Sequence, residues 1–225
     1  MRSFLSVGKK FQLVCSTGIS CEVYAKEEWP LSNAVVVNSF FGIGITNGPF
    51  NKIVEEGVNK CFERIANLDA VLWDEFSMNS SRDLELIHRI CSRVKGNNLP
   101  FGGIQFILIG DWLQLAPVPN NIYVENENLK MYQSPLFYNL LSHSIELDVI
   151  YRQDSKDVND ASFRKVLDDL RNGYCSEESE EFITEVLSKE FEIEQTGNTV
   201  DICFTRMEAD YFNACKLHLF DGQPF

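Results

Sequence analysis

Four short runs dominated by apolar residues stand out along the chain, and each ends at a polar residue or a glycine. They are Phe11 to Cys15, Ala70 to Trp73, Ile104 to Ile109 and Ile202 to Phe204. Apolar runs of this length are typical of strands that are buried on both faces, as in a parallel sheet. The pattern therefore predicts four strands of a mostly parallel sheet.

Helical patterns lie between these runs. From Arg82 to Lys95 the apolar residues fall on one helical face, Ser80 and Asp83 have the spacing of a capping box, and Gly96 supplies the stop. Two further helices are expected, one over residues 163–170 and a last one starting after Thr205. Alternating strands and helices predict a doubly wound α/β fold, in which ligands bind at the carboxyl ends of the strands.

Length and composition narrow the class of protein. A chain of 225 residues with 44% apolar content is long enough for one large α/β domain, or for one domain and part of another. No apolar run approaches the roughly 18 to 20 residues that span a bilayer, and Met1 to Leu13 has no signal-peptide pattern. We therefore expect an intracellular protein without a membrane segment. The seven cysteines form no C-x-x-C pair and are expected to be mostly buried free thiols.

The net charge of −13 argues against a polybasic DNA clamp. Nucleic-acid affinity that is independent of sequence comes mainly from lysine and arginine, so an acidic chain needs a local groove to bind DNA. The acidic excess is concentrated between Glu177 and Glu194, where a solvated helix face is the expected explanation. The stretch from Glu190 to Thr199 has the weakest pattern and is expected to join one part of the fold to the next.

The strongest chemical signal is Asp74 followed by Glu75, directly after the apolar run that ends at Trp73. This is a Walker B arrangement, in which one carboxylate holds Mg²⁺ and the second orients or deprotonates the water that attacks ATP. Asp74 suits the first role and Glu75 the second. An acidic pair after a strand is also an ordinary loop entry, and that alternative stays open on this signal alone.

Two more polar groups follow apolar segments. Gln114 lies just after the run that ends at Ile109, where an amide can contact both the γ-phosphate and the attacking water. Arg152 follows the stretch from Ile145 to Ile150 and is a candidate arginine finger. The alternatives are a loop glutamine satisfied by the backbone and a surface arginine in a salt bridge.

Six segments form a series of motifs along the chain: VCSTGIS (14–20), NSFFGIG (38–44), WDEFSM (73–78), PFGGIQ (100–105), GDWLQL (110–115) and YRQD (151–154). Taken together, these motifs resemble those of the Pif-type (petite integration frequency) helicases of superfamily 1B. The order and spacing of the motifs agree from about Phe11 to Gly173. The resemblance implies an α/β, RecA-like P-loop NTPase lobe in residues 1–175, followed by an acidic connector and the start of a second lobe in residues 176–225.

The resemblance also implies an activity and roles for single residues. Members are ATP-dependent 5′-to-3′ DNA helicases of recombination, repair and telomere maintenance, in the nucleus or the mitochondrion, and they use ATP with Mg²⁺. Four residues fall in motifs that contact single-stranded DNA or DNA junctions, and for Phe40 the alternative is core packing. By position, the implied roles are Asp74 for metal binding, Glu75 for water activation, Gln114 for γ-phosphate sensing, Arg152 for phosphate contact, and Ser16, Thr17, Ser39 and Phe40 for DNA contact.

The chain departs from the family pattern in three places. It has no glycine-rich loop of the form G-x-x-x-x-G-K-[ST], and Gly8-Lys9-Lys10 does not replace it. The strand that feeds this loop is expected to be missing as well, which would leave an unpaired gap in the sheet and an exposed apolar face. Residues 205–225 are expected to form only the opening strand and helix of the second lobe, and Asn38 stands where members usually have histidine. The alternatives are therefore an incomplete helicase, an inactive remnant that binds DNA or a protein, and an unrelated α/β binding protein.

Overall fold

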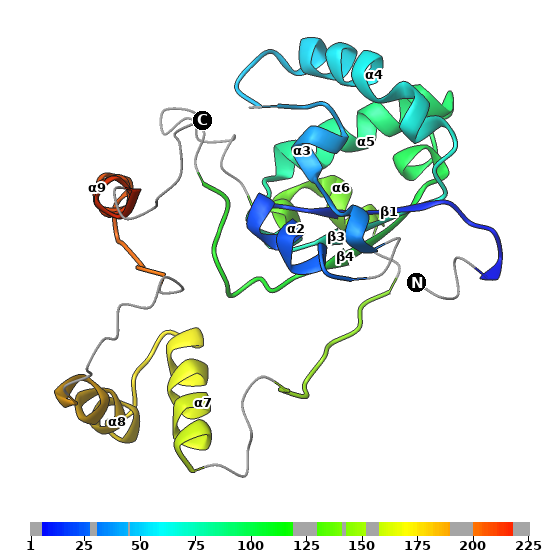
Figure 1. The fold of residues 1–225 in the computed structure, drawn as a ribbon. Helices are drawn as coiled ribbons and strands as arrows, with labels where there is room; N and C mark the ends of the chain where they lie inside the picture. The colour runs from blue at the N-terminus through cyan, green and yellow to red at the C-terminus, as the bar shows by residue number, and fades with distance from the viewer. Residues whose placement is uncertain are drawn as a thin grey trace. The chain divides into compact units, whose positions relative to one another are not determined.

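The computed structural model describes residues 6–27, 31–44, 46–118, 130–140, 143–151, 158–189 and 200–217. The chain divides into two compact units, Met1–Tyr174 and Cys175–Phe225. A four-stranded parallel sheet in the order β2-β1-β3-β4 forms the centre of the first unit (Figure 1). Its strands are β1 (Phe11–Cys15), β2 (Val35–Val36), β3 (Ala70–Asp74) and β4 (Gln105–Ile109).

The register of the sheet brings the carboxyl ends of the strands to one edge. Cys15 at the end of β1 lies opposite Asp74 at the end of β3, and Asp74 lies opposite Ile109 at the end of β4. Three of the four predicted strands are confirmed, with β4 starting at Gln105. The expected α/β class with a parallel sheet is confirmed as well.

The fourth predicted strand, Ile202 to Phe204, is wrong. These residues form no strand, and the side chains of Ile202 and Phe204 are 97% and 103% exposed. An apolar run becomes a strand only where a neighbouring strand can pair with its backbone. No such partner lies beside this segment among the described residues.

The helices of the first unit differ in length and role. The helix predicted from Arg82 to Lys95 is α5, and its capping box is confirmed: Ser80 and Asp83 exchange backbone-to-side-chain hydrogen bonds of 3.2 and 2.9 Å. Gly96 ends it in a left-handed conformation, with φ of 66°. The helices are α2 (Gly18–Tyr24), α3 (Val37–Phe40), α4 (Phe50–Ala66), α5 (Ser81–Lys95), α6 (Pro135–Leu140) and α7 (Val158–Arg171). Short 3-10 turns cover Leu31–Asn33, Phe76–Met78, Pro100–Gly103 and Met131–Gln133.

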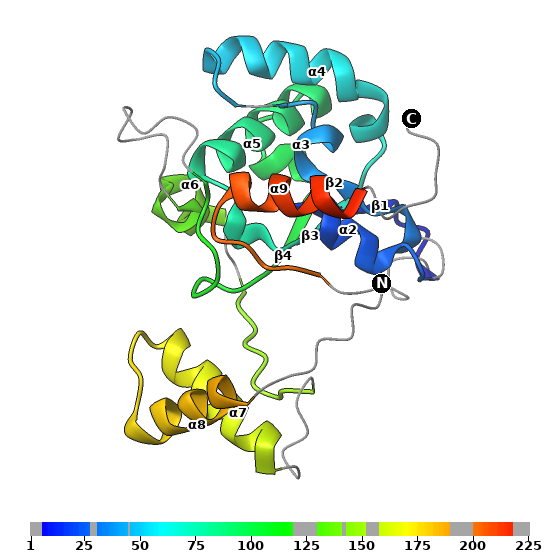
Figure 2. The same cartoon turned by 60° about the vertical axis from the view of Figure 1, so that its left-hand side comes forward.

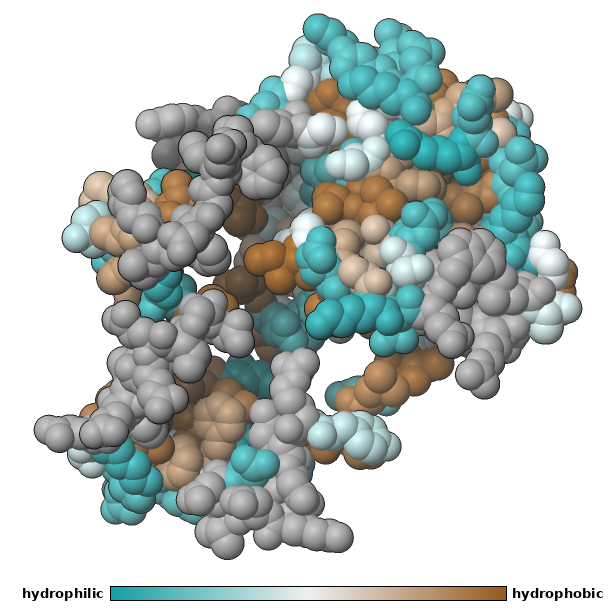
Figure 3. Space-filling model, in the orientation of Figure 1, coloured by the Kyte–Doolittle hydropathy of each residue, from teal (hydrophilic) through white to brown (hydrophobic). Residues whose placement is uncertain are grey.

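Helices α4 and α5 pack against each other (Figure 2). The contact is close at Gly57, where an added Cβ would lie 2.5 Å from Cδ1 of Ile90. The buried residues of α4 recur at helical spacing, and its other face is exposed and hydrophilic (Figure 3). Buried side chains of α4 and α5 therefore pack together with those of β1 and β3 in a single hydrophobic core.

In the described part of the chain the sheet has an unpaired position, but it lies at the outer edge of β4 and not inside the sheet as the sequence led us to expect. The four strands are contiguous, so no gap lies inside the sheet, and within the described ranges no strand pairs with the outer side of β4. A cavity of about 230 Å³ lies beside this strand, with Phe106, Leu108 and Phe137 among its lining residues. The open, apolar position is therefore at the edge of the sheet, next to β4.

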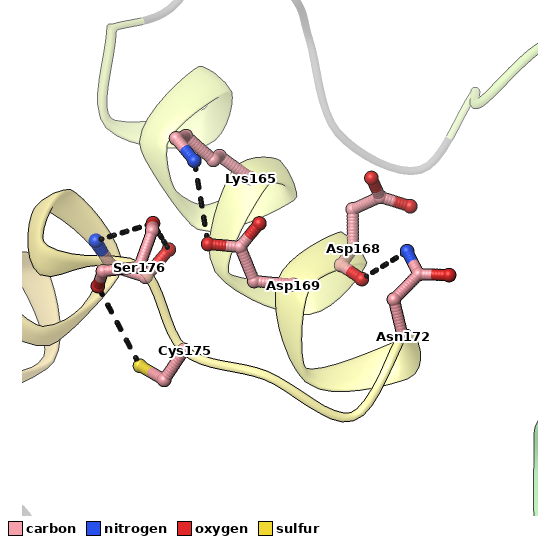
Figure 4. A network of polar contacts seen from close by, with 7 residues as sticks. Lys165, Asp168, Asp169, Asn172, Cys175 and Ser176 are labelled. Carbon is pink, nitrogen blue, oxygen red and sulfur yellow. Dashed lines mark hydrogen bonds and ion pairs between the residues drawn. The ribbon is translucent and has the colours of Figure 1, made fainter.

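The predicted helix over residues 163–170 is confirmed as part of α7. The ammonium group of Lys165 lies 3.3 Å from a carboxylate oxygen of Asp169. The side chain of Asn172 donates to the carbonyl of Asp168, and Figure 4 shows both contacts. Gly173 follows the helix with φ of 81°. This Lys165–Asp169 pair is spaced one helical turn apart, as ion pairs on a helix surface commonly are.

The second unit contains α8 (Glu177–Ser188) and α9 (Arg206–Leu217). Ser176 caps α8, and Thr205 and Glu208 form the expected start of α9. The described part of the acidic run lies in α8, where most glutamates are exposed, in agreement with a solvated helix face. The residues expected to join the two parts, Glu190 to Thr199, lie outside the described residues.

The cysteines agree only in part with the prediction of buried thiols. All seven are free; Cys15, Cys61 and Cys91 are buried, but Cys175 and Cys215 are exposed. Both exposed thiols lie in the second unit, where few side chains are buried. No helix within the described ranges is both long and apolar enough to cross a bilayer.

Candidate active site at the carboxyl ends of the strands

Asp74 and Glu75 lie at the edge of the sheet where three parallel strands end. Asp74 is the last residue of β3, and Glu75 begins the turn into the 3-10 segment Phe76–Met78. Glu75 has φ of 53° and ψ of 36°, a left-handed conformation that costs a residue with a Cβ about 1 to 2 kcal/mol. Strained backbone of this kind is often found at functional sites, where the surrounding structure holds it in place.

Tyr24, at the end of α2, holds the carboxylate of Asp74. Its hydroxyl donates a hydrogen bond of 2.7 Å to Oδ2 of Asp74. Burial, and then this bond to a carboxylate, raise the pKa of Tyr24 above its usual range, so the hydroxyl remains protonated near neutral pH. Cys15 is buried close by, and burial raises the pKa of its thiol to about 12, which keeps it neutral.

Ser16 connects β1 to the turn after β3. Its Oγ lies 2.6 Å from the carbonyl oxygen of Glu75 and also within hydrogen-bond distance of Oδ1 of Asn79. The indole N–H of Trp73 donates to the same Oγ over 3.3 Å. Because a hydroxyl has one proton, Ser16 donates to one of these oxygens at a time while it accepts from Trp73. These contacts fix the turn that carries Glu75.

Thr17 caps the helix that follows. Its Oγ1 accepts from the backbone N–H of Ser20 over 3.2 Å, and it lies 2.8 Å from Oγ of Ser20. Both candidate DNA-contact residues of this segment, Ser16 and Thr17, are partly exposed. Both residues follow β1 at the same edge of the sheet as Asp74, and their hydroxyl groups already form hydrogen bonds within the protein.

Gln114 follows β4 at this edge and is exposed. Its side-chain amide donates to Oδ2 of Asp111 over 3.2 Å, and its backbone N–H donates to the carbonyl of Asp111. Asp111 also forms an ion pair with Arg171, whose guanidinium donates a hydrogen bond to the Asp111 carboxylate. The hydrogen bond from Arg171 is the main reason that the pKa of Asp111 is lowered. Gln114 is therefore held in a turn built around Asp111.

The second group of candidate DNA contacts lies in α3. Ser39 is exposed, and its carbonyl oxygen accepts from Nη2 of Arg64 over 3.3 Å. Phe40 is only 5% exposed and packs edge-on against Phe41, with the guanidinium of Arg64 5.4 Å from its ring centre. This is the core-packing arrangement, so a role in stacking on a base would require Phe40 to leave the core.

Two residues singled out in the sequence remain: Asn38, which departs from the family pattern, and the candidate Arg152. The Asn38 side chain donates to the carbonyl of Gly44 over 3.0 Å, so it fixes the local loop. Arg152 lies outside the described residues. Within those ranges no group of three or more histidine, cysteine, aspartate or glutamate side chains is arranged to hold a metal ion.

The comparison with known proteins identifies the family. The model of the PIF1-like helicase family matches residues 6–181. The chain belongs to this family. This match confirms the resemblance that the sequence motifs indicate. The relatives described next also show how long the chain is in comparison with them.

Three matches illustrate the extent of the similarity. The ATP-dependent DNA helicase PIF1 of Emericella nidulans is 27% identical over 192 residues, which make up 84% of this chain and 25% of that protein. The crystal structure of Pif1 helicase from Candida albicans aligns with 99% of this chain and 47% of that one, at a TM-score of 0.78 and 24% identity. Bacteroides Pif1 in complex with ADP-AlF3 and ssDNA aligns with 96% of this chain and 49% of that one, at a TM-score of 0.71 and 23% identity.

These matches support the RecA-like fold of the first unit. The chain spans about a quarter of the length of that curated relative and about half of the solved structures. Tyr24 was not found from the sequence, because a tyrosine in a polar stretch, 50 positions away from Asp74, gives no local signal. The sequence offers one hint that Tyr24 could lie near the site. Tyr24 comes seven residues after Thr17, which places the two side chains on the same helical face, two turns apart.

Proposed function

We propose that the chain is part of an ATP-dependent 5′-to-3′ DNA helicase that acts in recombination, repair and telomere maintenance. The observation that carries the proposal is the carboxylate pair at the end of β3, with Glu75 in a strained left-handed turn that Ser16 braces. Such a pair, at the edge where parallel strands end, has the chemistry for hydrolysing a nucleotide. The family relatives named as ATP-dependent DNA helicases support the same reaction.

In this proposal each candidate residue has one task. Asp74 holds the Mg²⁺ of bound ATP, and Glu75 orients the attacking water and takes its proton. Gln114 senses the γ-phosphate, and Arg152 neutralises charge that develops on it. The fit of Asp74 to a cation rests on its donor atoms, because a carboxylate oxygen is the ligand that Mg²⁺ prefers. When bound, the ion supplies charge neutralisation on the phosphate oxygens.

Single-stranded DNA or a DNA junction is the proposed partner. The Bacteroides relative is described in complex with ssDNA. On the present chain the exposed Ser39 offers its hydroxyl group for phosphate contact, and Ser16 and Thr17 would exchange their hydroxyl contacts within the protein for a phosphate. The chain as a whole is acidic, with 20 lysine and arginine residues against 33 aspartate and glutamate residues, so binding of DNA would depend on a local groove. As part of a genome-maintenance enzyme, it is placed in the nucleus or the mitochondrion.

A second candidate function is an inactive, helicase-derived module that binds DNA or a protein. It concerns the 225 residues taken by themselves, which contain no glycine-rich phosphate loop of the G-x-x-x-x-G-K-[ST] form. Without backbone amides to cradle the phosphates, Asp74 alone has only a weak hold on a nucleotide and its metal.

DNA-stimulated ATP hydrolysis distinguishes the two functions. We would measure it for the 225-residue chain and for the same chain joined to an amino-terminal phosphate-loop segment and a second lobe taken from a family member. Activity of the joined chain alone supports a helicase with intact chemistry at Asp74 and Glu75. A joined chain that is folded, as judged by circular dichroism, but does not hydrolyse ATP supports the inactive module.

A further inference from the structure

Helix α2 is held at both ends by hydrogen bonds to the two residues that carry the carboxylate pair, Asp74 and Glu75. Just before the helix, Oγ of Ser16 lies 2.6 Å from the carbonyl oxygen of Glu75. At its last residue, the hydroxyl of Tyr24 donates to Oδ2 of Asp74 over 2.7 Å. A helix of seven residues is about 10 Å long, so these two contacts hold a short, rigid element across the turn that carries both carboxylates.

The bond from Tyr24 is directed at one atom of Asp74. A carboxylate has two oxygens, and within the described residues no protein group donates to Oδ1. A phenol that donates to Oδ2 restricts the rotation of the carboxylate about its last side-chain bond. Oδ1 is thereby left as the oxygen that is available to a cation. Partners of this kind, which bind a metal ligand rather than the metal, commonly change metal affinity by about 10- to 100-fold when they are removed.

We propose that Tyr24 is a positioning residue, which orients the Asp74 carboxylate for a divalent cation. The inference rests on the metal-binding role of Asp74 in the proposed function. Tyr24 does not touch the cation or the nucleotide itself. Its effect reaches them through the single hydrogen bond to Asp74, so removal of its hydroxyl weakens metal binding and leaves the fold in place.

Binding of Mn²⁺ in the presence of ADP, followed by electron paramagnetic resonance, tests this proposal. It is measured on the chain joined to a family phosphate-loop segment and second lobe, because Asp74 without the phosphate loop has only a weak hold on a metal. Manganese replaces magnesium because it is paramagnetic and is bound by the same oxygen ligands. Asp74→Asn first measures which part of the binding depends on Asp74, since a chain with a net charge of −13 also binds cations elsewhere. Tyr24→Phe then removes only the hydroxyl. Tyr138→Phe is the matched control, because Tyr138 is 71% exposed on α6.

The expected result is that Tyr24→Phe weakens the Asp74-dependent Mn²⁺ affinity about tenfold, while Tyr138→Phe leaves it unchanged. All variants are compared well below their thermal denaturation midpoints, so that a small loss of stability does not enter the affinity. If Asp74→Asn weakens binding but Tyr24→Phe does not, the positioning role is wrong and the metal-binding role of Asp74 stands. If Asp74→Asn has no effect, the metal-binding role in the proposed function fails, and the role of Tyr24 fails with it.

Discussion

The left-handed backbone of Glu75 makes a quantitative prediction about stability. With φ of 53°, any residue with a Cβ carries a strain of about 1 to 2 kcal/mol, whereas glycine carries none. Glycine also adds about 0.4 to 1 kcal/mol of conformational freedom to the unfolded chain, which offsets part of this gain. Glu75→Gly is therefore expected to be more stable than Glu75→Ala by about 0.5 to 1 kcal/mol.

The comparison with alanine isolates the backbone, because both variants lack the carboxylate and its contacts. For a chain of this size, 1 kcal/mol changes the denaturation midpoint by about 2 to 4 °C, so the expected difference is roughly 1 to 4 °C. Differential scanning calorimetry of the two variants measures it. Equal midpoints, or a higher midpoint for Glu75→Ala, would show that the turn is not strained and that the argument from backbone strain to function is unfounded.

Three further predictions concern packing, capping and protonation. Gly57→Ala should destabilise the fold by about 1 to 3 kcal/mol in chemical denaturation, because the added Cβ would overlap the side chain of Ile90 between α4 and α5; an unchanged midpoint would contradict this contact. Ser80→Ala should cost about 1 kcal/mol by removing the cap of α5, and a loss no larger than that of an exposed serine would argue against the capping box. Burial lowers the pKa of His88, whose Nδ1 accepts a backbone N–H over 3.0 Å, so the unfolded chain binds more protons than the folded one below about pH 6.5. Thermal stability should therefore fall from pH 7.5 to pH 5.5, and it should fall less steeply in His88→Gln; parallel pH profiles would refute this.

The parts of the fold that the sequence predicts well are those set by local patterns. The runs that became β1, β3 and β4 are apolar along most of their length, although only β3 and the carboxyl-terminal half of β1 are buried and β4, at the edge of the sheet, is partly exposed. The capping box of α5 depends on two residues three positions apart. Asp74 and Glu75 were placed correctly at the end of a strand for the same reason. A sequence pattern that lies within one helix or strand can be recognised without knowledge of the rest of the chain.

Features that depend on distant partners were not predicted. Ile202 to Phe204 has the composition of a strand but no neighbour to pair with among the described residues. The hydrogen bond from Tyr24 to Asp74 joins residues 50 positions apart, and only the register of β1 against β3 brings α2 to that carboxylate. Whether Phe40 lies in the core or on the surface also depends on the packing of Phe41 and Arg64 around it.

The proposed role of Glu75, activation of water for ATP hydrolysis, can be tested by comparing two matched substitutions. In the chain joined to a family phosphate-loop segment and second lobe, Glu75→Gln is measured beside Glu63→Gln, a matched substitution at an exposed residue of α4. We expect Glu75→Gln to bind ATP normally but to lose DNA-stimulated hydrolysis by at least about 100-fold, the scale of a general base. Glu63→Gln should hydrolyse ATP at the unsubstituted rate. Hydrolysis by Glu75→Gln at that same rate would contradict the assignment of Glu75.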